Sequence, residues 1–490
     1  TTEAAMIPTE LGLYRDIPIV IADCIDAEDT PTPPYEDPEE EISIETTNTT
    51  TPNTSTREKK VTGILIKIED EIPYIKNNKD SQSYKIILNQ EFEQSIDDLK
   101  RIDNRFINRS QIDINLINVY VDYLNKIITL NRDIESYLVI EPAWLINVSE
   151  LAGIDYCERK FFNNRFTRPS QNEAMIRGSI VHEIFEDVLK QKPRDQILSR
   201  WSDWFHKRSL DFAINEIEKN DVKEFSLKHI NALSNEELNN TLSEDIISVD
   251  TERFIINPDL GLKGKIDAVI KVRDNDSFRY KAVELKTGKS WGGNAKPGHA
   301  FQIRAYSLLM EMKGDNHQID PSVIYSGDWK EPYAGTIVRD VAINYEGKAK
   351  IINLRNILVL ADYTFKLKYE QDNPERKCPP CMRYQPDICN NLYNLEEEHD
   401  PTNIPQYQIR DNQYTEKEIQ FFNKTYRLFV EEYRSIKEEQ GRFLQKEPQQ
   451  RILEKKSIEI IDYEIHDIDN FEYTLSCKNE SEFREMDRCL

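Results

Sequence analysis

The stretch Gly261–Lys289 reads GLKGKIDAVIKVRDNDSFRYKAVELKTGK, two strand-like runs joined by a polar turn. Asp267 lies on the first run, and Glu284 and Lys286, two positions apart, share one face of the second. Because a hairpin would bring Asp267 beside Glu284, two carboxylates are expected to converge at a sheet edge. Such an oxygen-rich site suits Mg²⁺ or Mn²⁺. Lys286 could then orient an attacking water or neutralise charge on phosphoryl oxygens.

The segments around this hairpin predict an α/β core with a central sheet. A third strand-like run, TERFIIN, precedes the hairpin, and a helix, FQIRAYSLLMEM, follows it. On that helix Gln302 and Tyr306 are four positions apart and share a face, from which both could reach the active site or DNA phosphates.

His182 lies on an amphipathic helix expected over Glu173–Lys190. A histidine beside apolar residues is usually a core side chain. As a third ligand, His182 would instead complete a His, Asp, Glu site with positions left open for water and a scissile phosphate. Taken alone, Asp followed by Glu-x-Lys also occurs as a surface salt-bridge ladder. It is the order and spacing of all these motifs together that favour a metal site.

Composition and charge limit the classes of protein to which this chain could belong. The 490 residues suffice for two to four domains, and no run of eighteen apolar residues predicts a transmembrane helix. The net charge of -24 argues at first against a nucleic-acid partner. Between Cys157 and Arg177, however, basic and aromatic residues alternate, which suits the binding of single-stranded nucleic acid. An ordinary charged helix face would give the same pattern. The first residues lack a secretion signal, so an intracellular location is expected, nuclear in a eukaryote and cytoplasmic in a bacterium.

Changes in composition and hydrophobic pattern divide the chain into four parts. Residues 1–58 are expected to be a disordered or docking segment, because the Thr-, Pro- and acid-rich stretch at 29–58 cannot bury enough apolar surface. Residues 59–140 hold short Ile-, Val- and Tyr-rich runs that predict a small barrel or sandwich, plausibly OB-like. Residues 141–400 form the α/β part. Residues 401–490 hold an amphipathic helix from about Thr415 and the start of another strand-rich stretch near Ile458.

Seven cysteines, an odd number, favour metal binding over a disulfide framework. Cys378 and Cys381 form a C-x-x-C, Cys389 follows after seven residues, and Cys157 is a distant fourth candidate. Such a set fits either a Cys₄ zinc site or a [4Fe–4S] cluster. A broad visible absorbance band would identify the cluster, whereas zinc is colourless. Either metal would tie both ends of the catalytic part together.

The order of these motifs resembles the RecB-like branch of the PD-(D/E)XK nucleases: G-x-x-x-H at Gly178–His182, G-x-x-D at Gly264–Asp267, E-x-K at Glu284–Lys286 and Q-x-x-x-Y at Gln302–Tyr306. The resemblance implies a restriction-endonuclease-like core in which His182, Asp267 and Glu284 bind metal and Lys286 assists the nucleophile. Gln302 and Tyr306 would support the site or the strand.

The cysteines extend the resemblance to the iron–sulfur subgroup of that branch, and most closely to the nuclease domain of the eukaryotic replication nuclease–helicases that trim Okazaki-fragment flaps. It covers roughly residues 141–395 and implies a [4Fe–4S] cluster on Cys157, Cys378, Cys381 and Cys389. More weakly, it implies an OB-like barrel before the nuclease and a helical stalk with the start of a second barrel after it. The seven-residue gap before Cys389 is longer than this pattern usually has.

The expected function is therefore metal-dependent cleavage of single-stranded DNA or 5′-flaps in replication, repair or end resection. No G-x-x-x-x-G-K-[ST] occurs: the nearest string, Thr287–Ser290, has Val283 in place of the first glycine. A helicase is thus expected as a separate subunit or a missing part, because the chain stops before its last strands could close a domain. A single-strand-binding protein is a further candidate partner. Two rival hypotheses are a catalytically silent DNA-binding or scaffolding subunit and a zinc-stabilised binding module.

Overall fold

The structure is a computed structural model. It describes residues 55–88, 112–154, 173–233, 246–274, 277–312, 318–328, 337–364, 441–454, 459–467 and 472–478, with isolated positions at 92, 95 and 99, within 417–439 and at 457. Two units separate: Thr56–Gly441 is one, and Thr1–Ser55 with Arg442–Leu490 is the other. None of the helices in these ranges is long and apolar enough to cross a membrane.

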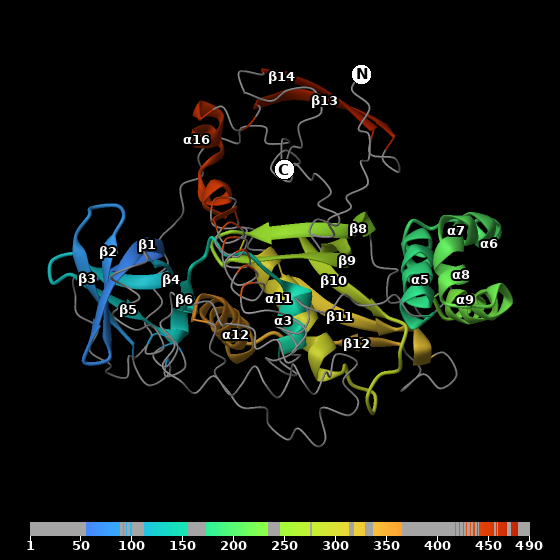
Figure 1. The fold of residues 1–490 in the computed structure, drawn as a ribbon, viewed down its shortest axis with the longest axis horizontal. Helices are drawn as coiled ribbons and strands as arrows, with labels where there is room; N and C mark the ends of the chain where they lie inside the picture. Colours follow the sequence, from blue (N-terminus) through green and yellow to red (C-terminus); the bar gives the residue numbers. More distant parts are fainter. Residues whose placement is uncertain are drawn as a thin grey trace. The chain divides into compact units, whose positions relative to one another are not determined.

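The first part of the larger unit is a small β-barrel (Figure 1). The sheet runs in the order β1-β2-β3-β5-β4-β6, and an added β1–β4 pairing closes five strands into a ring. This confirms the predicted strand-rich barrel, and five strands is the number in an OB-fold. The strands are β1 (Thr56–Glu69), β2 (Ile72–Asn77), β3 (Ser83–Ile87), β4 (Asp113–Asp122), β5 (Ile127–Leu130) and β6 (Tyr137–Ile140).

Strand β2 was not predicted from the sequence, which places Pro73 near its start. Proline lacks the N–H that a ladder needs, so it argues against a strand when read alone. Asp70 and Glu71 both have positive φ, 49° and 64°, as a two-residue hairpin turn between β1 and β2 requires. The hairpin turn and the closed ring of strands therefore outweigh the effect of the proline, and Ile72–Asn77 forms a strand.

The second part is a mixed sheet in the order β12-β11-β10-β9-β7, with β8 also paired to β9. The predicted runs become β8, β9 and β10, and β9 and β10 form the predicted antiparallel hairpin. Strand β11 lies parallel to β10 on its other side, so both strands of the hairpin are central rather than at a sheet edge. The strands are β7 (Ile146–Asn147), β8 (Ile246–Asn257), β9 (Leu262–Asp274), β10 (Ser277–Lys286), β11 (Ile319–Tyr325) and β12 (Val338–Asp340).

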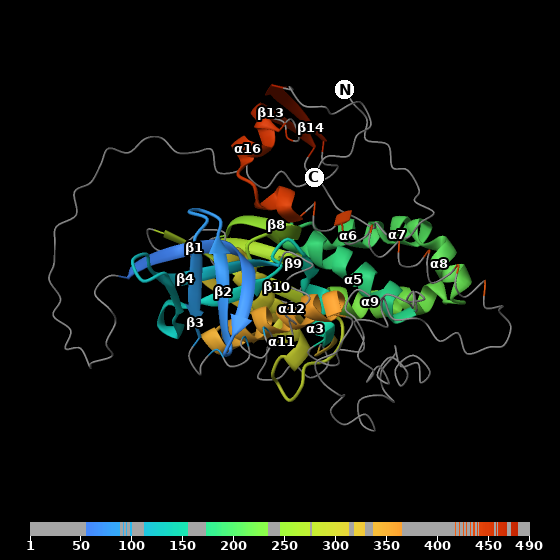
Figure 2. The ribbon, with the colours of Figure 1, turned by 60° about the vertical axis from the view of Figure 1, so that its left-hand side comes forward.

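Helices cover both faces of this sheet. One apolar core contains Ala282 together with residues of α3 (Val148–Ile154), α11 (Pro297–Glu311) and α12 (Tyr345–Thr364), and it continues into the barrel. The other contains Val283 and Leu285 and lies against the group α5–α9, which gathers beside the sheet in both views (Figures 1 and 2). That group comprises α5 (Glu173–Leu189), α6 (Arg194–Ser199), α7 (Trp201–Lys207), α8 (Ser209–Ile214) and α9 (Lys219–Leu233). The mixed α/β architecture is confirmed.

The smaller unit contains α16 (Pro448–Leu453) and the antiparallel pair β13 (Glu459–Asp467) and β14 (Glu472–Lys478). These two strands coincide with the strand-rich stretch expected near Ile458. Of the helix expected from about Thr415, the structure describes isolated positions within 417–439 and residues 441–445, all of them helical, and the rest lies outside the described residues.

Helix α12 joins the barrel to the sheet through the fully buried Arg355. Its guanidinium donates to the carbonyls of Ile140 and Glu141 at the end of β6, and to those of Trp144 (3.0 Å) and Gly261 (3.4 Å). The neighbouring Asn356 amide donates to the Leu138 carbonyl (2.8 Å) and accepts from the Ile140 N–H (3.0 Å). One helix turn therefore satisfies backbone groups on both sides of the junction.

Replacing Arg355 by Met should lower the free energy of unfolding by roughly 3 kcal/mol or more, because several buried carbonyls lose their donors at once. Thermal unfolding and limited proteolysis at the junction would measure the loss. The matched control is Arg304→Met on α11, since Arg304 makes a single bond to the Ala342 carbonyl near the surface. Equal losses in the two variants would contradict the role assigned to Arg355.

Candidate functional site

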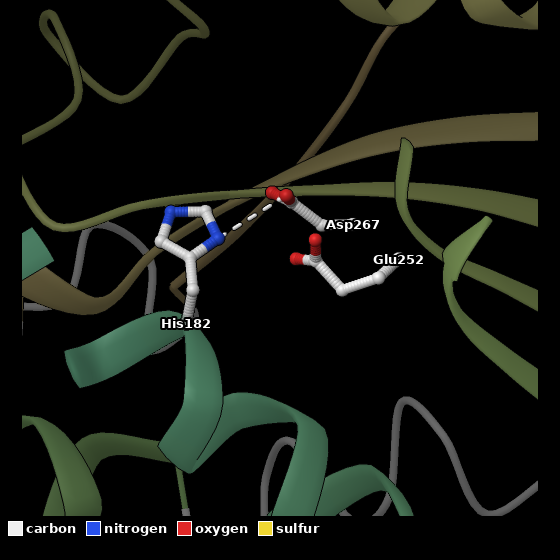
Figure 3. A group of neighbouring side chains, drawn as sticks. All are labelled: His182, Glu252 and Asp267. Atoms are coloured by element: carbon white, nitrogen blue, oxygen red, sulfur yellow. Dashed lines mark ion pairs between the residues drawn. The ribbon is translucent and has the colours of Figure 1, made fainter. Parts of the chain in front are cut away.

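Asp267 on β9 connects three elements of the larger unit (Figure 3). Its Oδ1 lies 3.1 Å from Nδ1 of His182 on α5, and its Oδ2 accepts a hydrogen bond of 2.7 Å from the Leu285 N–H on β10. Leu285 stands just beyond the last ladder pair, Val283 with Ala268. The carboxylate therefore occupies the place where the β9–β10 ladder opens, beside Glu284 as the hairpin predicted.

His182 is brought to Asp267, as the sequence predicted, and its side chain is 30% exposed. Burial lowers the pKa of the imidazole, but the hydrogen bond with Asp267 and the charges of Asp267 and Glu284 outweigh burial and leave the pKa above 6.5. A histidine binds a metal ion only in its neutral form, so a protonated His182 would have to lose its proton first. Any such ion must displace that proton, so its affinity would rise with pH.

Glu284 is buried, with 3% of its surface exposed. Its Oε1 accepts from Lys286 Nζ at 2.7 Å, while Oε2 has no hydrogen-bond partner among the described residues. Burial first, and then the charge of Asp267, raise the pKa of Glu284 to about 7, against the opposing effects of Lys286 and His182. A buried carboxylate oxygen without a partner is costly, and a cation is the group that would satisfy it.

Lys286 is held from two sides. Its Nζ donates to Glu284 Oε1 and, at 3.1 Å, to Oε1 of Gln302 on α11. Tyr306, one turn along the same helix, is 2% exposed, and burial raises the pKa of its phenol well above the usual range. A Cβ added at Gly264 would lie 2.6 Å from Cε1 of Tyr306, so only glycine allows the ring to approach β9 this closely. Both residues of the predicted helix face thus belong to the site.

Glu252 on β8 was missed by the sequence interpretation. It lies between the ladder pairs Thr251 with Ala268 and Arg253 with Ile266, and this register sets it opposite Asp267. Its φ of +55° lies in the left-handed region, an uncommon conformation for a non-glycine residue that costs energy. The only sequence signal was an acid in a strand next to the hairpin, which is too common to single it out.

The donor set fits a divalent cation. One ligand atom each from His182, Glu252 and Asp267 lie within 4.8 Å of one another (Figure 3). Glu252 also pairs with Lys265, and that pair would have to open to free both carboxylate oxygens. Carboxylate oxygens with an imidazole nitrogen match the preferences of Mg²⁺ and Mn²⁺ better than those of thiophilic metals.

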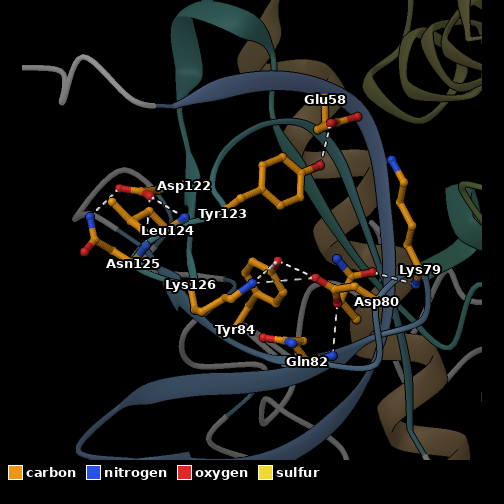
Figure 4. A network of polar contacts seen from close by, with 11 residues as sticks. Glu58, Lys79, Asp80, Gln82, Tyr84, Asp122, Tyr123, Leu124, Asn125 and Lys126 are labelled. Atoms are coloured by element: carbon orange, nitrogen blue, oxygen red, sulfur yellow. Dashed lines mark hydrogen bonds and ion pairs between the residues drawn. The ribbon is translucent and has the colours of Figure 1, made fainter.

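A second cluster of titratable side chains lies at one end of the barrel (Figure 4). Tyr84 donates to Asp80 Oδ2 at 2.6 Å and accepts from Lys126 at 3.2 Å. Tyr123 donates to Glu58 at 2.6 Å, which, with burial, raises the pKa of Tyr123 to about 12. Because these groups pair with one another, the cluster holds the barrel loops together and offers no open ligand position.

The predicted cluster ligands Cys157, Cys378, Cys381 and Cys389 lie outside the described residues. So does most of the basic and aromatic segment between Cys157 and Arg177. Arg177 itself is described: it pairs with Glu173, and its guanidinium carbon lies 5.1 Å from the centre of the Phe225 ring.

Comparison with known proteins points in the same direction as the geometry. Residues 77–272 match the family model of DNA replication factor Dna2. That segment includes His182, Glu252 and Asp267 and ends before Glu284.

Three full-length relatives carry the same description, DNA replication ATP-dependent helicase/nuclease. JHS1 of Arabidopsis thaliana is 22% identical over 289 residues, which cover 53% of this chain and 20% of the relative. DNA2 of Homo sapiens is 26% identical over 221 residues, which cover 36% of this chain and 20% of the relative. DNA2 of Mus musculus is 24% identical over 261 residues, which cover 45% of this chain and 23% of the relative.

The chain thus spans about a fifth of the length of these curated relatives. The identity is low, but the family-model match falls on the barrel from residue 77 onward and on α5, β8 and β9, which carry His182, Glu252 and Asp267. The resemblance predicted from the motifs is confirmed: over residues 77–272 this chain is similar to DNA replication factor Dna2, the eukaryotic replication nuclease–helicase.

Proposed function

We propose that this chain is the nuclease part of a metal-dependent DNA nuclease that cuts single-stranded DNA or 5′-flaps in replication, repair or end resection. One observation carries the proposal: Glu284 is buried within the electric field of Asp267 and His182 and bonded to Lys286, while its second oxygen has no partner among the described residues. A site that served only as a salt-bridge ladder would be expected to pair both oxygens. The similarity to replication nuclease–helicases supports DNA as the substrate.

His182, Asp267 and Glu284 would hold the metal ion, with Glu252 as a further ligand from β8. Mg²⁺ or Mn²⁺ there would supply Lewis-acid chemistry, by lowering the pKa of a bound water and by neutralising phosphate charge. A PD-(D/E)XK-type core is part of the proposal, and a central antiparallel hairpin followed by a helix and a parallel strand supports it.

The protein's own residues position the reacting groups. Glu284 and Gln302 aim the Lys286 ammonium, which donates a hydrogen bond to the attacking water or to a phosphoryl oxygen as a P–O bond breaks. Tyr306, on the same face of α11, makes a side-chain hydrogen bond with Gln302 and so helps to hold that amide in place. Burial of this group strengthens each of these electrostatic contacts.

The cluster and the partners belong to the same proposal. A [4Fe–4S] cluster on Cys157, Cys378, Cys381 and Cys389 would clasp the two ends of the nuclease part, and visible absorbance of the purified chain tests it. The helicase activity named in the relatives would come from another part of the protein or from a separate subunit. A single-strand-binding protein is a further candidate partner.

Asp267→Asn and Glu284→Gln should each lower the rate of cutting of a labelled 5′-flap oligonucleotide in Mg²⁺ by at least roughly 100-fold, because each removes a charge from the metal site. Chelation of Mg²⁺ should abolish cutting, and calorimetry should show weaker Mg²⁺ binding by both variants. The matched control is Asp320→Asn, since Asp320 pairs with Arg279 at the start of β11.

If the native chain and all three variants cut alike, the activity is a contaminant. A catalytically silent DNA-binding or scaffolding subunit then becomes the better account. Equal cutting of flap and blunt duplex DNA would remove the proposed strand preference while leaving the nuclease itself in place.

Two motif glycines should respond in opposite ways to alanine. Gly264→Ala should destabilise the chain by about 1–3 kcal/mol, because its Cβ would displace the Tyr306 ring, and should slow cleavage with it. A Cβ at Gly178 on α5 meets nothing within 4 Å, so Gly178→Ala should raise stability by roughly 0.5–1 kcal/mol through helix propensity. Thermal unfolding measures both, and a normal melting temperature with normal cleavage in Gly264→Ala would refute the packing argument.

A further inference from the structure

We propose that Trp291 is a stacking platform for a nucleobase of a single DNA strand bound beside the catalytic site. This rests on the proposed nuclease function and names a binding position within it. Trp291 is 67% exposed, among the more exposed large apolar side chains that the structure describes. It lies in the loop between β10, which carries Glu284 and Lys286, and α11, which carries Gln302.

The loop that carries Trp291 is a tight hairpin turn. Trp291 and Asn294 exchange two backbone hydrogen bonds, both of 3.0 Å. Between them Gly292 and Gly293 have φ of +55° and +80°, the pair of left-handed values of a type I′ turn. Since only glycine takes these values readily, the backbone that presents the indole is rigid by its own sequence.

Both ends of the loop are anchored in buried structure. On the first side, the N–H and hydroxyl of Ser290 donate to the two oxygens of Asp328, at 3.0 and 2.6 Å. Asp328 is itself buried and paired with Arg339 at 3.0 Å. On the second side, the Lys296 N–H donates to the Tyr325 hydroxyl at 2.8 Å. An exposed aromatic ring on an anchored turn loses little conformational freedom when a ligand stacks on it.

The position of the loop suits a strand that has its scissile phosphate at Lys286. Trp291 follows Lys286 by five residues, so its Cα is at most about 18 Å away. The far end of the loop is tied to the same strand pair: the Lys296 N–H donates to the hydroxyl of Tyr325, and Tyr325 pairs with Lys286 in the β10–β11 ladder. Trp291 is therefore within a few nucleotides of the bond to be cut.

The chemistry around Trp291 also favours a nucleic acid strand. Lys289 and Lys296, on either side of the turn, are both exposed. An aromatic face between cations is the arrangement that binds single strands without sequence preference, because every base has a π-face and every linkage a phosphate. A paired duplex keeps its bases stacked inside and would not offer one to the ring.

The test uses the full chain with Asp267→Asn, which should still bind DNA but not cut it. Binding of a fluorescein-labelled single-stranded oligonucleotide is followed by anisotropy. We expect Trp291→Ala to weaken this binding roughly tenfold and Trp291→Phe to retain most of it, with unchanged melting temperatures because the side chain is exposed. Leu210→Ala, at an equally exposed apolar side chain on α8, is the matched control and should change nothing.

Intrinsic fluorescence gives an independent readout. Unlabelled single-stranded DNA should quench tryptophan emission in the Asp267→Asn chain, and Trp291→Phe should remove much of that quenching. Blunt duplex should show no dependence on Trp291.

The outcomes separate this inference from the proposed function. If the parent chain binds single strands and Trp291→Ala leaves both affinity and quenching unchanged, the platform is refuted while the nuclease stands. The exposed ring would then be a candidate contact for a protein partner. If the parent chain binds no single strand at all, the proposed function and the platform both fail.

Discussion

The candidate site of this protein depends on the two contacts of the Asp267 carboxylate. One oxygen takes the Leu285 N–H of β10 and the other faces His182 of α5, so a single side chain joins two strands and a helix. Because the last β9–β10 ladder pair is Val283 with Ala268, the Asp267 carboxylate takes the place of a backbone acceptor for the Leu285 N–H. The same contact that closes the fold locally holds Asp267 in the group with His182 and Glu252 that could hold a metal ion.

The consequence is a site in which like charges are held together, and this lowers the free energy of unfolding. Burial first, and then repulsion from the Asp267 charge, raise the pKa of Glu284 to about 7. His182 and Lys286 offset part of the cost, but Oε2 of Glu284 has no hydrogen-bond partner among the described residues. Such concentrations of unfavourable charge cluster at functional sites, where a ligand compensates for them.

The rest of the larger unit keeps this arrangement rigid. The apolar core on the α11 side continues into the barrel, and Arg355 satisfies carbonyls on both sides of the junction. Lys348, buried on the same helix, pairs with Glu135 of the barrel (2.9 Å) and Glu311 of α11 (2.8 Å). The helix that positions Gln302 and Tyr306 is thus braced against the barrel, so the barrel contributes to the site without carrying any of its ligands.

The sequence by itself determined the features that arise from local periodicity. Alternation predicted the β9–β10 hairpin and the shared face of Glu284 and Lys286, and helical spacing predicted the common face of Gln302 and Tyr306. The barrel strands other than β2 followed from their β-branched runs. The cysteine ligands and the stalk stay predictions, since they lie largely outside the described residues.

Only the tertiary structure decided what depends on pairing between distant segments. Glu252 became a candidate ligand because the register of β8 against β9 sets it opposite Asp267, and the alternation of side chains within a strand does not reveal its pairing register. The central place of the hairpin required β11 to pair in parallel from beyond α11. The burial of Glu284, which leaves one of its oxygens without a partner among the described residues, required the packing of the whole sheet. Each of these depends on which segments meet in space, and local patterns carry no information about that.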